Sequence, residues 1–292
     1  MSDNNSSIAD QRKQRITGIF DRAAATYDHI GPRFFAHFGQ ALVDFAQIKP
    51  GSQVLDIATG RGALLFPAAQ AVGVTGHVMG MDISHSMVEE ARQEIRHRDL
   101  RNVEIQQMDA ERLLFPDGSF DYVLCGFALF FFPHLEQALE EMRRVLQPGG
   151  CLVVSTWEKY EDECWSWFDP LVDTFLPPEP EKPVEPGSTS PPPELDTSES
   201  MEKVLSVAGF IDIQHKTERF EAIYQDRDEW WSAQWSHGAR ALLEMIEKNL
   251  GSPGLEHFKA VVFEELIKHQ PAGGIRTNYP ALYVKAIRPV AC

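Results

Sequence analysis

Short apolar runs alternate with amphipathic segments over the first half of the chain. The runs have the length of buried strands and lie at residues 53–56, 78–82, 103–109, 120–126 and 150–156. Helix-compatible segments such as residues 63–72 lie between them. This alternation predicts right-handed βαβ units and a mostly parallel sheet.

Two amphipathic helices are expected before the first strand. From Arg15 onward apolar residues repeat at three- and four-residue spacing, and residues 34–45 repeat in the same way before a turn at residues 49–51. Residues 1–14 are polar and terminal, so we expect them to be frayed.

The composition changes after Thr156. Aromatic residues crowd the stretch 157–168, and residues 176–194 hold eight prolines together with Ser, Thr, Gly and Glu. Such a proline-rich run forms neither a helix nor a central strand. It is consistent with a lid over a substrate and equally with a surface loop that has no role.

Regular periodicity returns in the last third of the chain. It predicts a helix, a strand, two further helices and a closing strand, in this order, at residues 200–208, 211–220, 228–250, 256–269 and 282–287. We expect the two helices between the last two strands to form a cap over a substrate.

Charge and composition exclude several classes of function. The 292 residues carry a formal net charge of −16, which opposes binding to nucleic acid or to an anionic membrane. No run approaches 18 apolar residues, and residues 1–14 lack the apolar core of a signal peptide, so we expect a cytoplasmic protein without a membrane span. The four cysteines and ten histidines show no metal-ligand spacing, so no metal is predicted, and Cys125 and Cys151 read as buried structural thiols.

The stretch 53–62 combines a strand, a tight turn and the start of a helix. Gly60 and Gly62 leave the backbone bare where a ligand can approach closely. The spacing Asp56-x-Ala58-x-Gly60-x-Gly62 is not the G-x-G-x-x-G of a dinucleotide site, and its leading acid suits a cationic or amine-bearing ligand better than a pyrophosphate.

Three successive apolar runs close with an acid. These acids are Asp56, Asp82 and Asp109. An acid after the second strand of a doubly wound sheet can accept both hydroxyls of a ribose. A lone acid here would more simply be an exposed strand end or a helix N-cap, but three at one edge favour a ligand site. Asp121 begins a strand and is expected to be structural.

In order and spacing these motifs resemble the class I S-adenosylmethionine-dependent methyltransferases. Within them the chain is most similar to the ubiquinone/menaquinone-biosynthesis type (methyltransferase type 11) and to small-molecule tailoring enzymes. Residues 20–28 resemble the F-D-x-x-A-x-x-Y-D opening of that type. The resemblance covers residues 16–157 well and the remainder loosely.

The resemblance implies an α/β fold: a Rossmann-like, doubly wound, seven-stranded, mostly parallel sheet with an N-terminal helical lid and a helical cap near the C-terminus. After a disordered segment 1–14, the single domain 15–292 would divide into N-terminal helices, a cofactor-binding core, a proline-rich loop or lid, and C-terminal strands with the cap. These parts would span residues 15–48, 49–157, 158–198 and 199–292.

The resemblance also places the cofactor, S-adenosylmethionine. Residues Ala58 to Gly62 would contact its methionyl part, Asp82 its ribose and Asp109 its adenine amine. The full implied set is Asp56, Ala58, Thr59, Gly60, Gly62, Asp82, Ile83, Met87, Met108, Asp109, Ala110, Cys125 and Gly126.

An apolar or aromatic small-molecule acceptor is expected beside the fourth strand, because the Arg-Asn pair of the quinone enzymes is replaced here by apolar residues. The acceptor-binding candidates are Phe127, Phe130, Phe131, Trp157 and Trp235. Tyr27 is a candidate catalytic residue by resemblance, and His134 and His237 are candidate general bases. Each of these also has an ordinary structural interpretation, as a packing ring or a solvated histidine.

Methyl transfer from a sulfonium is a direct displacement that needs positioning more than catalytic groups, which fits the absence of a Ser/His/Asp or Cys/His set. We therefore expect transfer to oxygen, nitrogen or carbon of a small molecule, as in natural-product biosynthesis. The alternatives are a peptide or protein acceptor, a non-catalytic cofactor-binding protein, and an NAD-dependent oxidoreductase, which the missing G-x-G-x-x-G disfavours. The sequence does not determine the oligomeric state.

Overall fold

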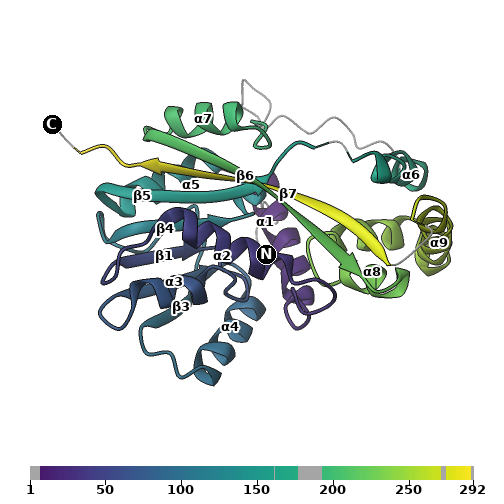
Figure 1. Cartoon of the computed structure of the whole chain (residues 1–292), viewed down its shortest axis with the longest axis horizontal. Coiled ribbons are helices and arrows are strands. Elements are labelled where there is room, and N and C mark those ends of the chain that lie inside the picture. Colours follow the sequence, from purple (N-terminus) through teal and green to yellow (C-terminus); the bar gives the residue numbers. More distant parts are fainter. Residues whose placement is uncertain (1–6, 161, 177–192, 271–273, 291–292) are drawn as a thin grey trace, which may run out of the picture.

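Seven strands form one sheet in the computed structural model of the chain, which describes residues 7–160, 162–176, 193–270 and 274–290 (Figure 1). Their order across the sheet is β3-β2-β1-β4-β5-β7-β6. The first five pair in parallel, and β7 runs antiparallel to both of its neighbours. The strands are β1 (Gln53–Ile57), β2 (His77–Asp82), β3 (Val103–Gln107), β4 (Phe120–Gly126), β5 (Leu146–Trp157), β6 (Ile211–Tyr224) and β7 (Ile275–Ile287). The predicted doubly wound, mostly parallel fold is confirmed.

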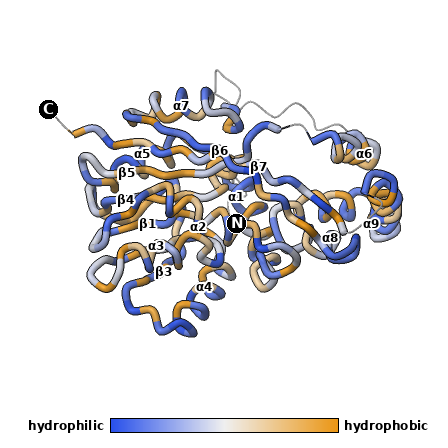
Figure 2. The backbone as a smooth tube through the Cα atoms, viewed as in Figure 1, coloured by the Kyte–Doolittle hydropathy of each residue, from blue (hydrophilic) through white to orange (hydrophobic). Residues whose placement is uncertain are grey.

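Helices cover both faces of the sheet. One face packs against α2 (Phe34–Ala46), α3 (Leu65–Val72) and α4 (His85–His97), and the other against α5 (Leu135–Val145) and α7 (Ser198–Val207). Strand β1 is buried on both faces for this reason, and Figure 2 shows β1, β4 and β5 as mainly apolar. The edge strand β6 is mostly exposed and hydrophilic.

Besides the apolar clusters on the two faces of the sheet, a third apolar cluster forms a cap beside the sheet. Strands β6 and β7 continue to pair with each other from Arg219↔Pro280 to Tyr224↔Ile275, beyond the point where β5 ends at Trp157. This two-stranded extension carries α8 (Arg227–Gln234) and α9 (Arg240–His269), and α6 (Phe168–Phe175) packs on them (Figure 1). The predicted helices between the last two strands are confirmed, and their role as a cap over a substrate stays a prediction.

The first helix begins earlier than expected. Helix α1 spans Ile8–Ala23, so the prediction that residues 1–14 are frayed is wrong for Ile8 onward. The Ser7 hydroxyl accepts from the Asp10 N–H, and the Asp10 carboxylate accepts from the Ser7 N–H. This capping box satisfies the free N–H groups of the first turn.

Other boundaries differ in the second half of the chain. The predicted helix 228–250 is broken at residues 235–239, and α9 then continues past a kink at Gly251 (φ 71°) where a gap was expected. Helix α6 and the short 3-10 helix Glu163–Trp165 lie within the predicted loop 158–198, because their aromatic rings pack on the cap. Residues 177–192, most of the proline-rich segment, lie outside the described residues.

Strands β6 and β7 are also longer than their hydrophobic patterns indicated. The extra residues of the two strands pair with each other, and their buried side chains pack on the cap. They do not cross the buried centre of the sheet, so they lack a continuous apolar run. Within the described ranges, no helix is long and apolar enough to cross a membrane.

Candidate functional site

The turn after β1 is shaped by residues with positive φ. Ala58 has φ 54°, Gly60 φ 54° and Gly62 φ 91°. A Cβ added at Gly60 would meet nothing within 4 Å, so the backbone there faces open space. The Thr59 hydroxyl donates to Oδ2 of Asp56 at 2.5 Å and fixes the start of the turn. The turn thus offers bare backbone at the carboxyl end of β1.

Asp82 connects the turns after β1 and β2. Its Oδ2 accepts the Gly60 N–H at 2.9 Å, and its Oδ1 accepts the Ser84 N–H at 2.8 Å. Burial raises the pKa of Asp82 to about 6, and the two N–H donors oppose that rise. The carboxylate is therefore held in place before any ligand arrives.

Asp56 is fully buried beneath the same turn. Its Oδ1 has no hydrogen-bond partner within the described part of the chain. Burial raises the pKa of Asp56 to about 7, with the Thr59 hydrogen bond opposing the rise and the nearby Asp82 charge adding to it. A buried carboxylate with an unused oxygen is suited to a cationic or N–H-bearing ligand.

Asp56→Asn is expected to change how stability depends on pH. Because the folded-state pKa of Asp56 lies above its unfolded value of 3.8, the wild-type carboxyl adds stability at low pH and loses it as the pH rises towards 7. Between pH 5.5 and 8 the unfolding free energy of the wild type should fall by about 2 kcal/mol relative to the variant. Urea denaturation of both proteins at the two pH values measures this, and a constant difference would show that Asp56 titrates normally.

Asp109 follows β3 and already has two donors. Lys13 Nζ lies 2.7 Å from its Oδ2, and the Glu111 N–H donates to its Oδ1 at 2.9 Å. Lys13 also pairs with Oε2 of Glu111 at 2.5 Å. An adenine amine would share Asp109 with this lysine, which the sequence pattern did not indicate.

Helix α1 and the turn after it lie across the carboxyl ends of β1 and β2. Asp21 Oδ1 accepts the Ser84 hydroxyl at 2.6 Å and the Ser86 N–H at 3.1 Å. Arg61 Nη1 donates to the carbonyl oxygens of Ala24 and Ala25 at 2.8 and 2.7 Å. The N-terminal helix thus has the position of a lid, held by groups that sequence reasoning missed although Asp21 lies in the recognised opening motif.

The remaining predicted cofactor residues surround these carboxylates. The Met108 N–H donates to the Asp82 carbonyl oxygen, the Gln107 amide donates to the Ile83 carbonyl oxygen, and Met87 is buried in the first turn of α4. Ala110 is buried beside Met108. Cys125 is fully buried in β4, and burial together with the nearby Asp56 and Asp82 charges raises the pKa of its thiol.

These features fit S-adenosylmethionine. The unpartnered Asp56 oxygen and the open space at Gly60 suit the amine-bearing methionyl part, and Asp82, at the end of β2, offers the carboxylate acceptor that ribose hydroxyls require. No group of three or more His, Cys, Asp or Glu residues in the described ranges could hold a metal.

A cluster of aromatic side chains adjoins this edge of the sheet. Tyr27 stacks on Phe35 with ring centroids 5.2 Å apart, and Phe127 packs on Trp157 at 4.1 Å. Phe35 contacts both Phe127 and Trp157, which joins the two pairs. Phe131 packs on Phe20 and Phe130. We call Phe20, Tyr27, Phe34, Phe35, Phe127, Phe131, Trp157 and Tyr279 the aromatic cluster.

Phe127 has an unusual backbone conformation. Its φ is 50°, a left-handed value that a bulky side chain rarely adopts. The Phe127 N–H donates to the Ser155 carbonyl oxygen at 2.9 Å and to the Ser155 hydroxyl at 3.2 Å, and these bonds hold it there. Directly after β4, this backbone turn directs the ring onto Trp157.

The predicted catalytic residues have different surroundings. Tyr27 lies in the aromatic cluster, and burial with the nearby Asp28 and Asp82 charges raises its pKa. His237 lies between α8 and α9, with its ring 5.7 Å from that of Phe34. His134 is exposed at the start of α5, where its backbone N–H donates to Glu111.

Trp235 is not among the rings of the aromatic cluster. It belongs to the cap, where its carbonyl oxygen accepts from Arg240 and its ring lies 5.3 Å from that guanidinium. Its role in binding an acceptor therefore has no support from its contacts, whereas Phe127, Phe131 and Trp157 come together as expected.

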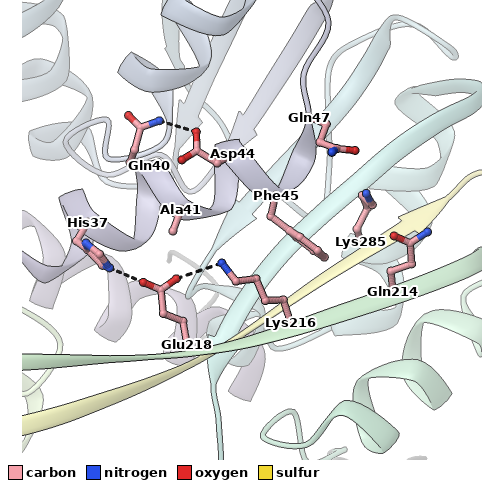
Figure 3. A pocket seen from close by; sticks show the side chains of 10 residues that line it. All are labelled: His37, Gln40, Ala41, Asp44, Phe45, Gln47, Gln214, Lys216, Glu218 and Lys285. Atoms are coloured by element: carbon pink, nitrogen blue, oxygen red, sulfur yellow. Dashed lines mark hydrogen bonds and ion pairs between the residues drawn. The ribbon is translucent and has the colours of Figure 1, made fainter.

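A separate groove lies between α2 and strands β6 and β7 (Figure 3). It has a volume of about 610 Å³ and an open, mixed-charge lining. Figure 3 shows Glu218 between His37 and Lys216. Its Oε1 lies 2.5 Å from Nε2 of His37, and its Oε2 lies 3.6 Å from Nζ of Lys216. None of the predicted cofactor or acceptor residues lines this groove, so it is distinct from the site above.

Comparison with known proteins places the chain among methyltransferases. A family described as "Methyltransferase domain" matches residues 54–150. The nocamycin O-methyltransferase of Saccharothrix syringae is 30% identical over 283 residues, covering 93% of this chain and 98% of that protein. The aklanonic acid methyltransferase DauC of Streptomyces sp. (strain C5) is 45% identical over 138 residues, covering 47% of this chain and 63% of that protein.

A solved structure supports the fold. The YcgJ protein of Bacillus subtilis superposes with a TM-score of 0.57 at 20% identity, covering 87% of this chain and all of that one. At this identity the likeness concerns the fold alone. The chain thus matches one relative along nearly its whole length, and DauC over less than two thirds of DauC's length.

Proposed function

The chain belongs to the class I S-adenosylmethionine-dependent methyltransferases, and from that premise we propose that it methylates a small aromatic acceptor. The observation that carries the proposal is the aromatic cluster, which adjoins the carboxyl ends of the strands where Asp56, Gly60 and Asp82 meet. Stacked and edge-on rings bind planar apolar molecules and exclude water.

The chain's own residues would act mainly by positioning. Asp82 and the turn at Gly60 would hold the nucleoside and methionyl parts, and Asp56 would balance positive charge from beneath. When bound, S-adenosylmethionine would supply a methyl group on a sulfonium, with its thioether as the leaving group for in-line attack by the acceptor atom. Tyr27 and Phe35 would lie against the acceptor, and α1 would close the site from water.

Two relatives support a small molecule as acceptor. One is the nocamycin O-methyltransferase and the other the aklanonic acid methyltransferase. We therefore favour transfer to oxygen over nitrogen or carbon. The net charge of −16 disfavours a nucleic-acid acceptor. The unpaired thiols of Cys125, Cys151 and Cys164 fit a reducing compartment, and we place the protein in the cytoplasm.

Calorimetric titration with S-adenosylmethionine, S-adenosylhomocysteine and NAD tests the proposal. We expect micromolar binding of the first two and none of NAD, because the turn lacks the three-glycine pattern of a pyrophosphate site. Binding of NAD alone, or of none of the three, would refute it.

A further inference from the structure

His237 lies against the aromatic cluster although it comes from the cap. Its ring meets Phe34 edge-on at 5.7 Å, and Phe34 in turn stacks on Tyr279 at 4.2 Å and lies 6.3 Å from Trp157. A Cβ added at the next residue, Gly238, would lie 3.9 Å from Cζ of Phe131. His237 and Gly238 therefore border the proposed acceptor site.

The hydrogen bonds of His237 identify which ring nitrogen carries the proton. The Ala239 N–H donates to Nδ1 at 3.3 Å, so Nδ1 is an acceptor and a neutral imidazole must carry its proton on Nε2. Burial lowers the pKa of His237 to about 4, which keeps the ring neutral at pH 7. Nε2 is buried and has no hydrogen-bond partner among the described residues.

A buried N–H without an acceptor costs free energy that a bound ligand can recover. We propose that the Nε2–H of His237 donates to a carboxylate oxygen of the acceptor, so that the substrate is an aromatic carboxylic acid and the product its methyl ester. This inference rests on the proposed methyltransferase function. It changes the expected role of His237, because a nitrogen that already carries a proton cannot serve as the general base.

The titratable groups around the cluster favour a carboxylic acid over a phenol. Burial raises the pKa of Tyr27 and Tyr279, and that of Tyr224 to about 12, so these groups stay protonated at pH 7. Burial raises the pKa of Asp28 to about 6, and its two oxygens accept the N–H groups of Phe35 and Ala36, which hold this carboxylate against the start of α2. An acceptor that arrives ionised needs no group to remove its proton, and at pH 7 a carboxylic acid of pKa about 4 is ionised whereas a phenol of pKa about 10 is not.

The step balances without a base. One carboxylate oxygen forms the new bond to the methyl carbon while the methyl–sulfur bond breaks and its electron pair stays on sulfur. The charges of carboxylate and sulfonium cancel, and no proton moves. His237 would hold the other oxygen and so orient the attacking one.

Binding measurements with two matched probes test the proposal. We expect 2-naphthoate to bind the wild-type protein, saturated with S-adenosylhomocysteine, at least tenfold more tightly than 2-naphthol does. His237→Phe should abolish this preference, because it removes the donor and keeps a planar ring. His237→Gln should retain most of it, since its amide can donate but cannot act as a base. His215→Gln, on the exposed face of β6, is the control for the same substitution.

The outcomes distinguish a failure of the methyltransferase function from a failure of the carboxylate inference alone. Failure of the wild type to bind S-adenosylhomocysteine would overturn the methyltransferase proposal and this one with it. Normal cofactor binding without a preference for 2-naphthoate, or without binding of either probe, would overturn only the carboxylate inference. Normal cofactor binding by His237→Phe shows that the variant is folded.

A spectroscopic readout needs no acceptor. In protein labelled with ¹⁵N-histidine, the resonance that disappears in His237→Gln should show the Nε2–H form between pH 5.5 and 8, and it should shift when 2-naphthoate is added. A proton on Nδ1 instead would contradict the assignment of donor and acceptor.

Discussion

Asp82→Ala should weaken binding of S-adenosylmethionine and S-adenosylhomocysteine at least tenfold. The carboxylate is expected to accept the ribose hydroxyls, and it already accepts the N–H groups of Gly60 and Ser84. Alanine would leave these donors without their partner and would loosen the turns after β1 and β2. The loss should therefore exceed that of a single hydrogen bond to the ligand.

Calorimetry of the variant and the wild type measures this effect. Asp121→Ala is the matched control, because Asp121 lies at the start of β4 and accepts the Gln53 N–H away from the strand ends that bind the cofactor. We expect its cofactor affinity to be unchanged. Equal affinities of Asp82→Ala and the wild type would remove Asp82 from the binding site.

Gly39→Ala should destabilise the fold by about 2 kcal/mol or more. Gly39 lies buried in α2, and a Cβ built there would come within 2.2 Å of the Ala63 carbonyl oxygen and 2.6 Å of its carbon. These are backbone atoms of the turn that follows Gly62, so relief requires α2 or that turn to move. A moved turn would also displace Gly60 and Gly62, and cofactor affinity should fall together with stability.

A glycine-to-alanine substitution in α1 should instead raise the stability of the fold. A Cβ at Gly18 would meet only the end of the Arg22 side chain, whose ion pair with Glu244 lies at the surface and can shift with it, so Gly18→Ala should stabilise the protein by up to about 1 kcal/mol through helix propensity. Urea denaturation of both variants provides the comparison. A Gly39→Ala protein as stable as the wild type would show that the contact between α2 and Ala63 is not tight.

Local patterns were enough to predict the core of this protein. Buried parallel strands appear in the sequence as short continuous apolar runs. An acid that ends such a run is easily recognised, because it directly follows the last apolar residue of the strand. Asp56, Asp82 and the glycine turn were found in this way, and the structure brings them together at one edge of the sheet. The start of α1 was missed although its capping box, Ser7 and Asp10, is written in the sequence.

Contacts between distant segments could not be predicted in the same way. Lys13 meets Asp109 across 96 positions, and His237 reaches Phe34 only because β6 and β7 extend beyond β5 and carry the cap to the aromatic cluster. Which nitrogen of His237 holds the proton depends on the Ala239 backbone N–H, a geometry that no residue pattern contains.

The sequence by itself therefore determined the sheet, its order of strands and helices along the chain, and the residues at the strand ends, because hydrophobic period and glycine placement act over a few residues. The tertiary structure alone decided what closes the site and what faces the acceptor. The lid, the cap and the aromatic cluster are formed by segments that contact one another only after the chain has folded. Burial in these contacts then shifts the pKa of each titratable group and so decides its charge.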